Sequence, residues 1–165
     1  MWQYFYGIPL LFSSCDTSSQ QTLQAPSKEF FQESLRELHI PVSQTIRDVE
    51  ITEVQGLHKK YKLSIQHFPK EHIVYISIFD YLSLQQSQSP ASTTFLLTQI
   101  ATLNYTIIGA KLQLNPQTGA LVFGTEINVL DGLSKKTVQH VIKRLISLAD
   151  AHYEKLQKSM QGTYY

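Results

Sequence analysis

Three β-rich segments follow one another with only short turns between them, and this arrangement constrains the fold more than any other feature. The segments are DVEITEV at residues 48–54, KYKLSIQHF at residues 60–68 and HIVYISIFDYL at residues 72–82. β-Branched and aromatic residues dominate all three, as is typical of strands. Connections this short join antiparallel neighbours. We therefore predict three antiparallel strands in a meander.

The second of these segments alternates between apolar and polar side chains. Tyr61, Leu63 and Ile65 are apolar or aromatic, and the residues between them are polar. Successive side chains of a strand point to opposite faces of the sheet, so we expect one face to be buried and the other to be in contact with water. A second hairpin is predicted in GAKLQLNPQTGALVFGTEINVL, residues 109–130, where NPQTG supplies proline and glycine for the reversal of the chain.

Helical spacing of apolar residues predicts three helices. One covers about residues 28–39, and a second covers about residues 92–104. The third begins after Ser134, a good N-cap, although Lys135 and Lys136 in its first turn oppose the helix dipole. Its apolar stripe consists of Val138, Val141, Ile142, Leu145, Leu148, Ala149, His152 and Leu156.

The order of elements is helix, three strands, helix, two strands, helix. Helices that are separated from runs of strands favour the α+β class with an antiparallel sheet of about five strands, and not a parallel sheet. A chain of 165 residues has the size of one domain with a single core once a leader and tether are set aside. We place this domain at residues 28–160.

Several short sequence features mark the boundaries of the predicted elements in residues 96–156. This stretch contains most of the second helix, the hairpin and the last helix. The features are Leu103–Asn104 near the end of the helix, the hairpin around residues 115–119, Leu133–Ser134 before the last helix, and the LISLADAHY run within it. In these features the chain resembles the YbjN family, whose domains share the type III secretion chaperone-like fold. The resemblance implies a non-enzymatic module that binds protein segments or pairs with itself as a homodimer.

The first fifteen residues contain no charged side chain and are rich in aromatic and aliphatic ones. The apolar stretch is too short for a membrane-spanning helix, which needs about 20 residues, but long enough for a secretory leader. Its end, LFSSC at residues 11–15, resembles the bacterial lipoprotein box, in which the cysteine is diacylated. We therefore predict a signal segment at residues 1–14, lipidation of Cys15 and a membrane anchor on the periplasmic or cell-surface side.

Residues 15–27 are rich in serine, glutamine and threonine and are expected to form a flexible tether. A single acyl chain binds a membrane only marginally, whereas two bind it stably, so a diacylated Cys15 would be an anchor. The alternative is that Cys15 is an ordinary buried thiol and that residues 1–26 belong to a cytoplasmic protein.

The net charge of the chain argues against a nucleic acid as its partner. Fourteen Lys and Arg residues against thirteen Asp and Glu residues give a formal net charge of +1. This balance offers no electrostatic reason to expect a nucleic acid as partner.

The residues that could carry chemistry form no recognised motif. No pair among His39, His58, His67, His72, His140 and His152 has the spacing of a zinc finger or of HExxH, although His67 and His72 flank a turn and could approach each other. Glu126 and Asp131 could act as an acid and base pair only if their environments separated their pKa values. No nucleophile elbow or glycine-rich phosphate loop is present. We predict no catalytic residue, no metal and no cofactor.

These observations lead to one main hypothesis and two alternatives. The main hypothesis is a lipid-anchored α+β module of a bacterial envelope that binds another protein or peptide through sheet edges or a groove between helix and sheet. The first alternative is a soluble, cytoplasmic, chaperone-like homodimer. The second is a small hydrolase that uses its histidines.

Overall fold

A computed structural model describes residues 24, 26–42, 44–46, 49–83 and 90–160. Within them, six strands form one antiparallel sheet in the order β1-β2-β3-β4-β6-β5. The strands are β1 (Gln44–Ile46), β2 (Val49–Gln55), β3 (Lys60–Phe68), β4 (Ile73–Ser83), β5 (Lys111–Leu114) and β6 (Ala120–Asn128). The helices are α1 (Lys28–Glu37), α2 (Pro90–Thr106) and α3 (Lys135–Met160). The predicted α+β class is confirmed, and the predicted order of helices and strands differs from the observed one only by the additional strand β1.

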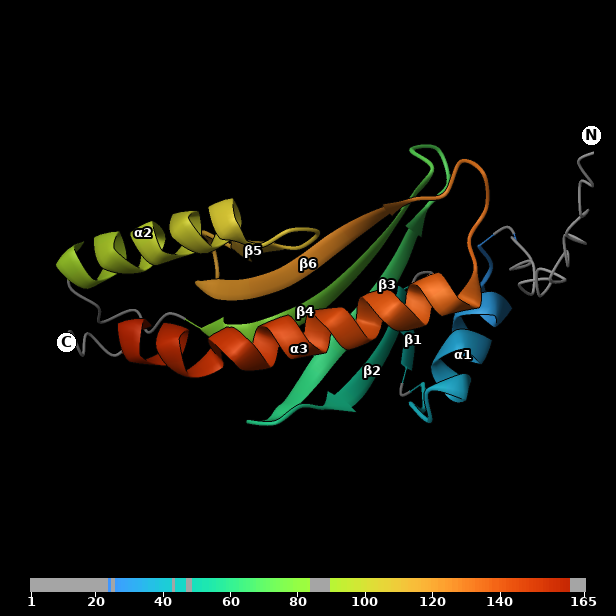
Figure 1. Ribbon diagram of the computed structural model, residues 1–165, viewed down its shortest axis with the longest axis horizontal. Coiled ribbons are helices and arrows are strands. Elements are labelled where there is room, and N and C mark those ends of the chain that lie inside the picture. The colour runs from blue at the N-terminus through green and yellow to red at the C-terminus, as the bar shows by residue number, and fades with distance from the viewer. Residues whose placement is uncertain (1–23, 25, 43, 47–48, 84–89, 161–165) are drawn as a thin grey trace, which may run out of the picture.

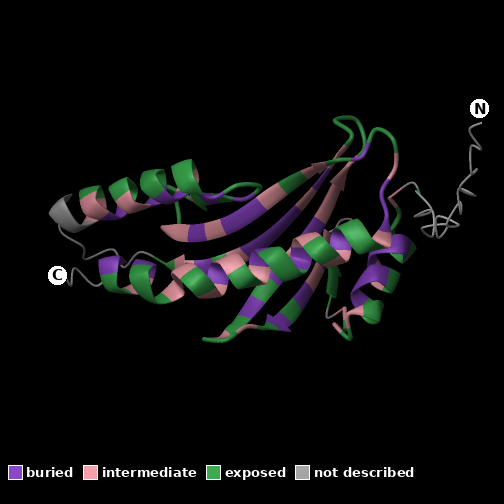
Figure 2. Ribbon diagram, in the orientation of Figure 1, coloured by how far each residue is buried: buried purple, intermediate pink, exposed green. Residues whose placement is uncertain are grey.

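The helices cover one face of the sheet. Figure 1 shows α3 lying along the sheet, with α1 beside the N-terminal half of α3 and α2 beside its C-terminal half and β5. The alternation predicted for the second β-rich segment is confirmed, because Tyr61, Leu63 and Ile65 of β3 are at most 1% exposed. Figure 2 shows buried positions that recur at intervals along the strands and along α3. The core therefore lies between this face of the sheet and the helices.

α1 has a defined start and a defined end. The side chain of Ser27 accepts a hydrogen bond from the backbone N–H of Phe30 at 3.2 Å, which satisfies one of the free donors of the first turn. His39, with a φ of 59°, takes the left-handed conformation that commonly ends a helix. Phe31 and Leu35 are buried, so the predicted apolar face of this helix lies in the core.

α3 begins as predicted, after Ser134. The Ser134 hydroxyl accepts a hydrogen bond from the backbone N–H of Thr137 at 3.1 Å. Lys135 pairs with two carboxylates of α1, Glu33 at 2.6 Å and Glu37 at 3.2 Å. These exposed pairs offset the unfavourable position of Lys135 near the positive end of the helix dipole and join α3 to α1.

The estimate of about five strands was one too low. β1 is only three residues long and all three are exposed, so no alternation of apolar and polar residues marks it in the sequence. It forms because it pairs with the first three residues of β2: Ile46 with Val49, Thr45 with Glu50 and Gln44 with Ile51. The boundaries of α2 also differ, since α2 extends two residues beyond the predicted range of 92–104 at each end.

On the face of β2 that packs against the helices, two of the buried side chains are polar. Glu50 and Thr52 are 2% and 1% exposed, whereas Val49 and Ile51 point to the other face of the sheet and are only partly buried. The Thr52 hydroxyl donates a hydrogen bond to the backbone carbonyl of Pro41, in the connection after α1. This side of the core, between α1 and β2, therefore contains polar side chains beside the apolar ones of α1.

Among the described residues, no helix combines the length and the apolar character that crossing a membrane requires.

Candidate functional site

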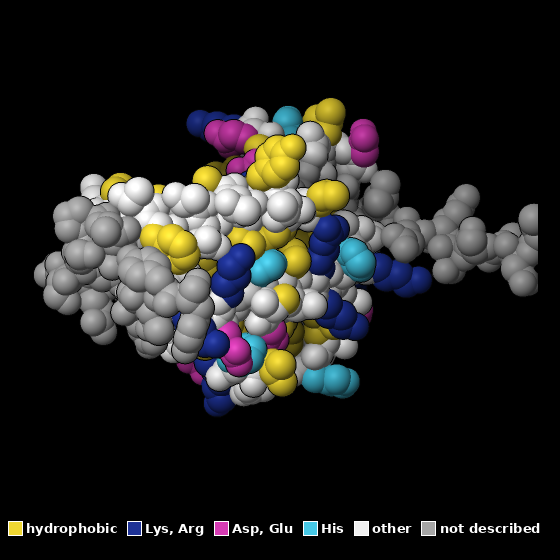
Figure 3. Space-filling model, turned by 60° about the vertical axis from the view of Figure 1, so that its left-hand side comes forward, with side chains coloured by type: hydrophobic (Ala, Val, Ile, Leu, Met, Phe, Trp, Pro, Cys, Tyr) yellow, Lys and Arg dark blue, Asp and Glu magenta, His cyan; other side chains and the backbone are white. Residues whose placement is uncertain are grey.

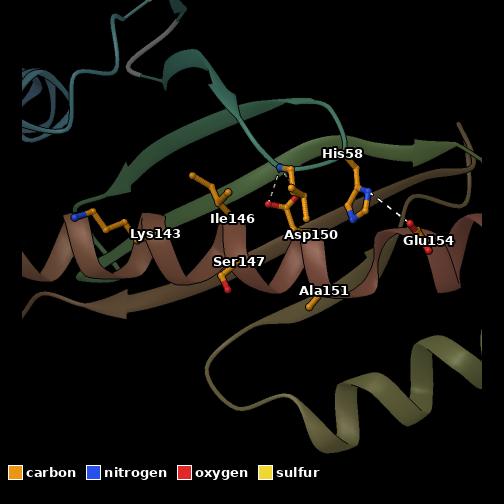
Figure 4. Close-up of a pocket in the computed structure, with 8 residues that line it drawn as sticks. His58, Lys143, Ile146, Ser147, Asp150, Ala151 and Glu154 are labelled. Carbon is orange, nitrogen blue, oxygen red and sulfur yellow. Dashed lines mark hydrogen bonds and ion pairs between the residues drawn. The ribbon is translucent and has the colours of Figure 1, made fainter.

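A hollow of about 730 Å³ lies between α3 and the turn that joins β2 to β3 (Figure 4). Two of its lining residues, Leu57 and His58, belong to the turn. The others project from one side of α3: Lys143, Ile146, Ser147, Asp150, Ala151 and Glu154.

A second hollow, of about 540 Å³, adjoins the first. It is bounded by residues 38–41 after α1, by the facing ends of β2 and β3, and by Ile142 of α3. Lys143 and Ile146 line both hollows, so the two are continuous. We call this continuous depression the α3 groove. At a rise of about 1.5 Å per residue, the stretch of α3 that borders it, residues 142–154, is about 18 Å long.

Asp150 attaches the β2–β3 turn to α3. Its two carboxylate oxygens each accept a hydrogen bond from the backbone N–H of Leu57 at 2.9 Å, and Oδ1 also accepts one from the Tyr61 hydroxyl at 2.6 Å. Burial and the hydrogen bond to Asp150 raise the pKa of Tyr61 well above its ordinary value. The phenol therefore remains a donor over the whole physiological pH range.

Gly56 is required for this attachment because no space remains for a side chain. A Cβ atom at this position would lie 2.1 Å from Cε2 of Tyr61 and 2.8 Å from Oδ1 of Asp150. The Tyr61 ring is buried and cannot turn aside easily. Only glycine lets the backbone of the turn approach the Asp150 carboxylate this closely.

The second residue of the hollow, His58, rests on an aromatic ring of α3. Its imidazole stacks on Tyr153 with ring centroids 5.3 Å apart and an interplanar angle of 14°. Nδ1 of His58 lies 3.9 Å from a carboxylate oxygen of Glu154. Next to it, Lys59 donates a hydrogen bond to the backbone carbonyl of Tyr81 at 3.1 Å, and burial lowers the pKa of Lys59. Both side chains thus support the turn.

The side chain of Leu57 points into solvent although its backbone is held in place. It is 81% exposed, the largest value for a large aliphatic side chain in the part of the chain that the structure describes. Ile146 and Ala151 of α3 provide further apolar surface nearby, and the charged Lys143 and Glu154 stand at the edge. Apolar side chains bordered by polar and charged ones are common at sites of protein–protein contact.

Charges of both signs surround this site. Figure 3 shows Lys or Arg, Asp or Glu, and His side chains dispersed among hydrophobic ones on one face of the molecule. Lys60 and Glu53 line the groove together. An electrostatic surface of this kind does not favour a polyanion, in agreement with the net charge of +1.

Of the histidines that the sequence singled out, His67 and His72 lie near each other at the β3–β4 turn, and His152 lies on α3. His67 is partly buried in β3, and its pKa is lowered by burial and by the nearby His72. His152 is partly buried on α3, and its pKa is lowered by burial and by Lys155. Among the described residues, no three His, Cys, Asp or Glu side chains converge to hold a metal ion.

The other candidate residues from the sequence are the carboxylates Glu126 and Asp131 and the thiol of Cys15. Glu126 is exposed on β6, and Asp131 is exposed in the loop that follows it. Neither carboxyl group lies in the apolar surroundings that an acid and base pair needs. Cys15, the predicted lipidation site, lies outside the described residues.

Sequence analysis missed the residues that form the α3 groove. Leu57 stood in a segment interpreted only as a turn, and Asp150 stood on the polar side of a helix. The one signal available was Gly56–Leu57, a glycine followed by a large apolar residue in a turn otherwise made of polar residues. No sequence pattern links it to Asp150, which follows Leu57 by 93 positions.

No protein-family model matches the chain, and no curated protein matches it. Solved structures match its fold. YbjN from E. coli has a TM-score of 0.59 at 12% sequence identity, over 81% of this chain and 96% of that chain. An uncharacterized protein from Methanothermobacter thermautotrophicus has a TM-score of 0.57 at 17% identity, over 85% of this chain and all (100%) of the other.

A chain in the structure of the HopA1–SchA chaperone–effector complex is also similar. Its TM-score is 0.54 at 14% identity, over 75% of this chain and 90% of that chain. At such low identities the similarity concerns the fold alone. The protein therefore has a YbjN-like fold, as the features of residues 96–156 predicted.

Proposed function

We propose that the protein is a non-enzymatic module that binds a segment of another protein in the α3 groove. The observation that carries this proposal is Leu57, an exposed leucine whose backbone is held by Asp150 at the edge of a long depression. Its position is fixed before binding, so little conformational entropy is lost when a partner covers it. The fold shared with a chain of a chaperone–effector complex supports the same function.

Photocrosslinking in intact cells tests this proposal. A photoreactive amino acid at Ser147, which is exposed in the groove, should form a crosslink to a partner. The same amino acid at Gln113, which is exposed on β5, should not form that crosslink. The partner found in this way is then purified, and its dissociation constant is measured with variants of the groove.

Leu57→Ser should weaken binding of the purified partner about 10- to 100-fold, because burying a leucine side chain contributes about 1.5–3 kcal/mol. Leu130→Ser is the matched control, since Leu130 is 66% exposed in the loop between β6 and α3, outside the groove. Equal binding by wild type and Leu57→Ser would contradict the proposal, as would an equal loss with Leu130→Ser.

We further propose that Cys15 anchors the module to a bacterial membrane through lipid. The support is the LFSSC sequence after an apolar, uncharged opening segment, and the polar residues that follow it. A diacylated cysteine provides two chains, which suffice for stable anchoring. Wild type should partition into the detergent phase and accumulate as a precursor in globomycin, whereas Cys15→Ala should do neither. Equal solubility of the two would refute the anchor.

A second candidate function, a homodimer without a lipid anchor, is favoured by the surface of α2. Residues 81–110 contain no Asp, Glu, Lys or Arg, although α1 and α3 carry many. The exposed Leu97, Ala101 and Tyr105 follow one another at intervals of four along the helix. The hydroxyls of Thr98, Thr102 and Thr106 donate to carbonyls four residues earlier at 2.9–3.2 Å, so they require no outside partner.

This face of α2 suits contact with the same face of a second copy of the chain. Two uncharged surfaces do not repel each other when a two-fold axis brings them together. In an antiparallel pair that crosses at Ala101, Leu97 of each copy would lie against Tyr105 of the other. Sedimentation equilibrium should then show a dimer that Ala101→Glu converts to a monomer. Thr125→Glu, a substitution on β6, is the control. A wild-type monomer at high concentration would refute this candidate.

A further inference from the structure

Glu50 is a buried carboxylate whose hydrogen-bond partners among the described residues are two uncharged side chains. It is 2% exposed between α1 and β2. Oε2 accepts a hydrogen bond from the Thr45 hydroxyl at 2.9 Å and a long one from Nε2 of Gln32 at 3.4 Å. No ion pair joins it to a Lys, Arg or His within the part of the chain that the structure describes.

These hydrogen bonds compensate only part of the free-energy cost of burying the Glu50 carboxylate. Buried charges in proteins are as a rule paired, because removing a carboxylate from water costs several kcal/mol that hydrogen bonds from neutral groups offset only in part. A hydroxyl and a distant amide are weak compensation, since charge-assisted bonds to a cation are shorter and roughly twice as strong. Among the described residues, no positively charged group supplies this stronger bond to Glu50.

A pocket of about 440 Å³ lies next to the two residues that bind this carboxylate. Gln32 and Thr45, the two residues that bind Glu50, both line it. Its wall includes Pro41, whose carbonyl is held by the hydroxyl of Thr52. We call it the α1–β1 pocket. A ligand that displaces the weakly bound amide of Gln32 would reach Glu50 from solvent.

The α1–β1 pocket is continuous with the α3 groove, because Ile40 and Pro41 line both. We propose that the α1–β1 pocket receives the cationic end of a lysine or arginine side chain, carried by the segment that occupies the α3 groove. The link to that segment rests on the proposed function. The ammonium or guanidinium group replaces the Gln32 amide at Glu50, and the aliphatic stem lies against Ile40, Pro41 and Val42.

The charge at the rim of the pocket does not prevent this binding. Arg36 is the one cationic side chain among the described residues that line the pocket, and it is exposed to solvent. Exposed charges are screened by water and salt, whereas the interaction with the buried Glu50 carboxylate is screened much less. The attraction of the ligand to Glu50, once the Gln32 amide is displaced, therefore exceeds its repulsion by Arg36.

The experiment uses the full chain and n-butylammonium as the probe, with 1-butanol as its uncharged counterpart. Chemical shifts of the backbone amides of residues 44–52 report binding, and titration gives the dissociation constant. We expect saturable binding of n-butylammonium, at least tenfold stronger than that of 1-butanol. Glu50→Gln should abolish this preference, while Glu53→Gln, an exposed neighbour on the same strand, should preserve it.

Gln32→Ala provides a second readout, because it removes the group that competes for Glu50 and should tighten binding of n-butylammonium. Equal binding of the charged and uncharged probes to wild type would overturn the proposal, as would undiminished preference in Glu50→Gln. These outcomes do not depend on the α3 groove. Loss of partner binding in Leu57→Ser tests the groove alone, so the two proposals fail separately.

Discussion

The carboxylate of Asp150 binds the backbone N–H of Leu57 through both of its oxygens, each at 2.9 Å. This contact joins the middle of α3 to the turn between β2 and β3, and it holds Leu57 at the edge of the α3 groove. The hydroxyl of Tyr61 binds the same carboxylate at 2.6 Å. One side chain thus shapes the site through three hydrogen bonds to two other residues, Leu57 and Tyr61.

Asp150→Ala should destabilise the protein by about 1.5–3 kcal/mol, because hydrogen bonds to a charged group are lost and the Tyr61 hydroxyl loses its acceptor. Urea denaturation of both proteins measures this difference. Glu154→Ala, one turn further along α3 and exposed, should change the free energy of unfolding by less than about 0.5 kcal/mol. Equal effects of the two substitutions would show that Asp150 does not attach the turn.

Gly56→Ala should cost about 1–3 kcal/mol, because its Cβ atom would overlap the buried ring of Tyr61. Gly124→Ala should cost less, even though its Cβ atom would lie 2.1 Å from the Tyr75 hydroxyl. That hydroxyl is the far end of a partly exposed side chain, which can swing away. Thermal or urea unfolding of the two variants compares them, and a larger loss in Gly124→Ala would contradict the role given to Tyr61.

Stability should fall as the pH decreases below about 6.5. Burial, with Lys155 nearby, lowers the pKa of His152 from its ordinary value of 6.5, so the folded state binds the proton less readily than the unfolded state. The loss is therefore absent above pH 6.5 and grows as the pH falls through the lower pKa of the folded protein. His67 contributes in the same direction.

His152→Gln should reduce this dependence, measured as the difference in urea midpoint between pH 7.5 and pH 5. His140→Gln, at an exposed position of the same helix, should leave the difference unchanged. An undiminished pH dependence in His152→Gln would show that the titration occurs elsewhere.

Ser134→Ala should destabilise the protein by about 0.5–2 kcal/mol, because the backbone N–H of Thr137 loses the side-chain oxygen that caps α3. Ser147→Ala serves as the control at an exposed position within the same helix, where alanine favours helix formation. Unfolding by urea gives both values. A loss in Ser147→Ala as large as that in Ser134→Ala would contradict the capping role.

The amino-acid sequence by itself determined the features that depend on neighbouring residues. The alternation of Tyr61, Leu63 and Ile65 with polar residues identified β3 and its buried face, and the apolar stripe after Ser134 identified α3 and its start. These signals are reliable because the side-chain period of a strand or helix is a local property of the backbone. The order of such elements was sufficient to predict the α+β class.

Only the tertiary structure decided the features that depend on residues far apart in the chain. β1 exists because β2 offers it hydrogen bonds, and Glu50 and Thr52 face inward because α1 and Pro41 lie over that side of β2. The α3 groove likewise requires that Leu57 meet Asp150 across 93 positions. No local period encodes such contacts, since each results from the packing of the whole chain.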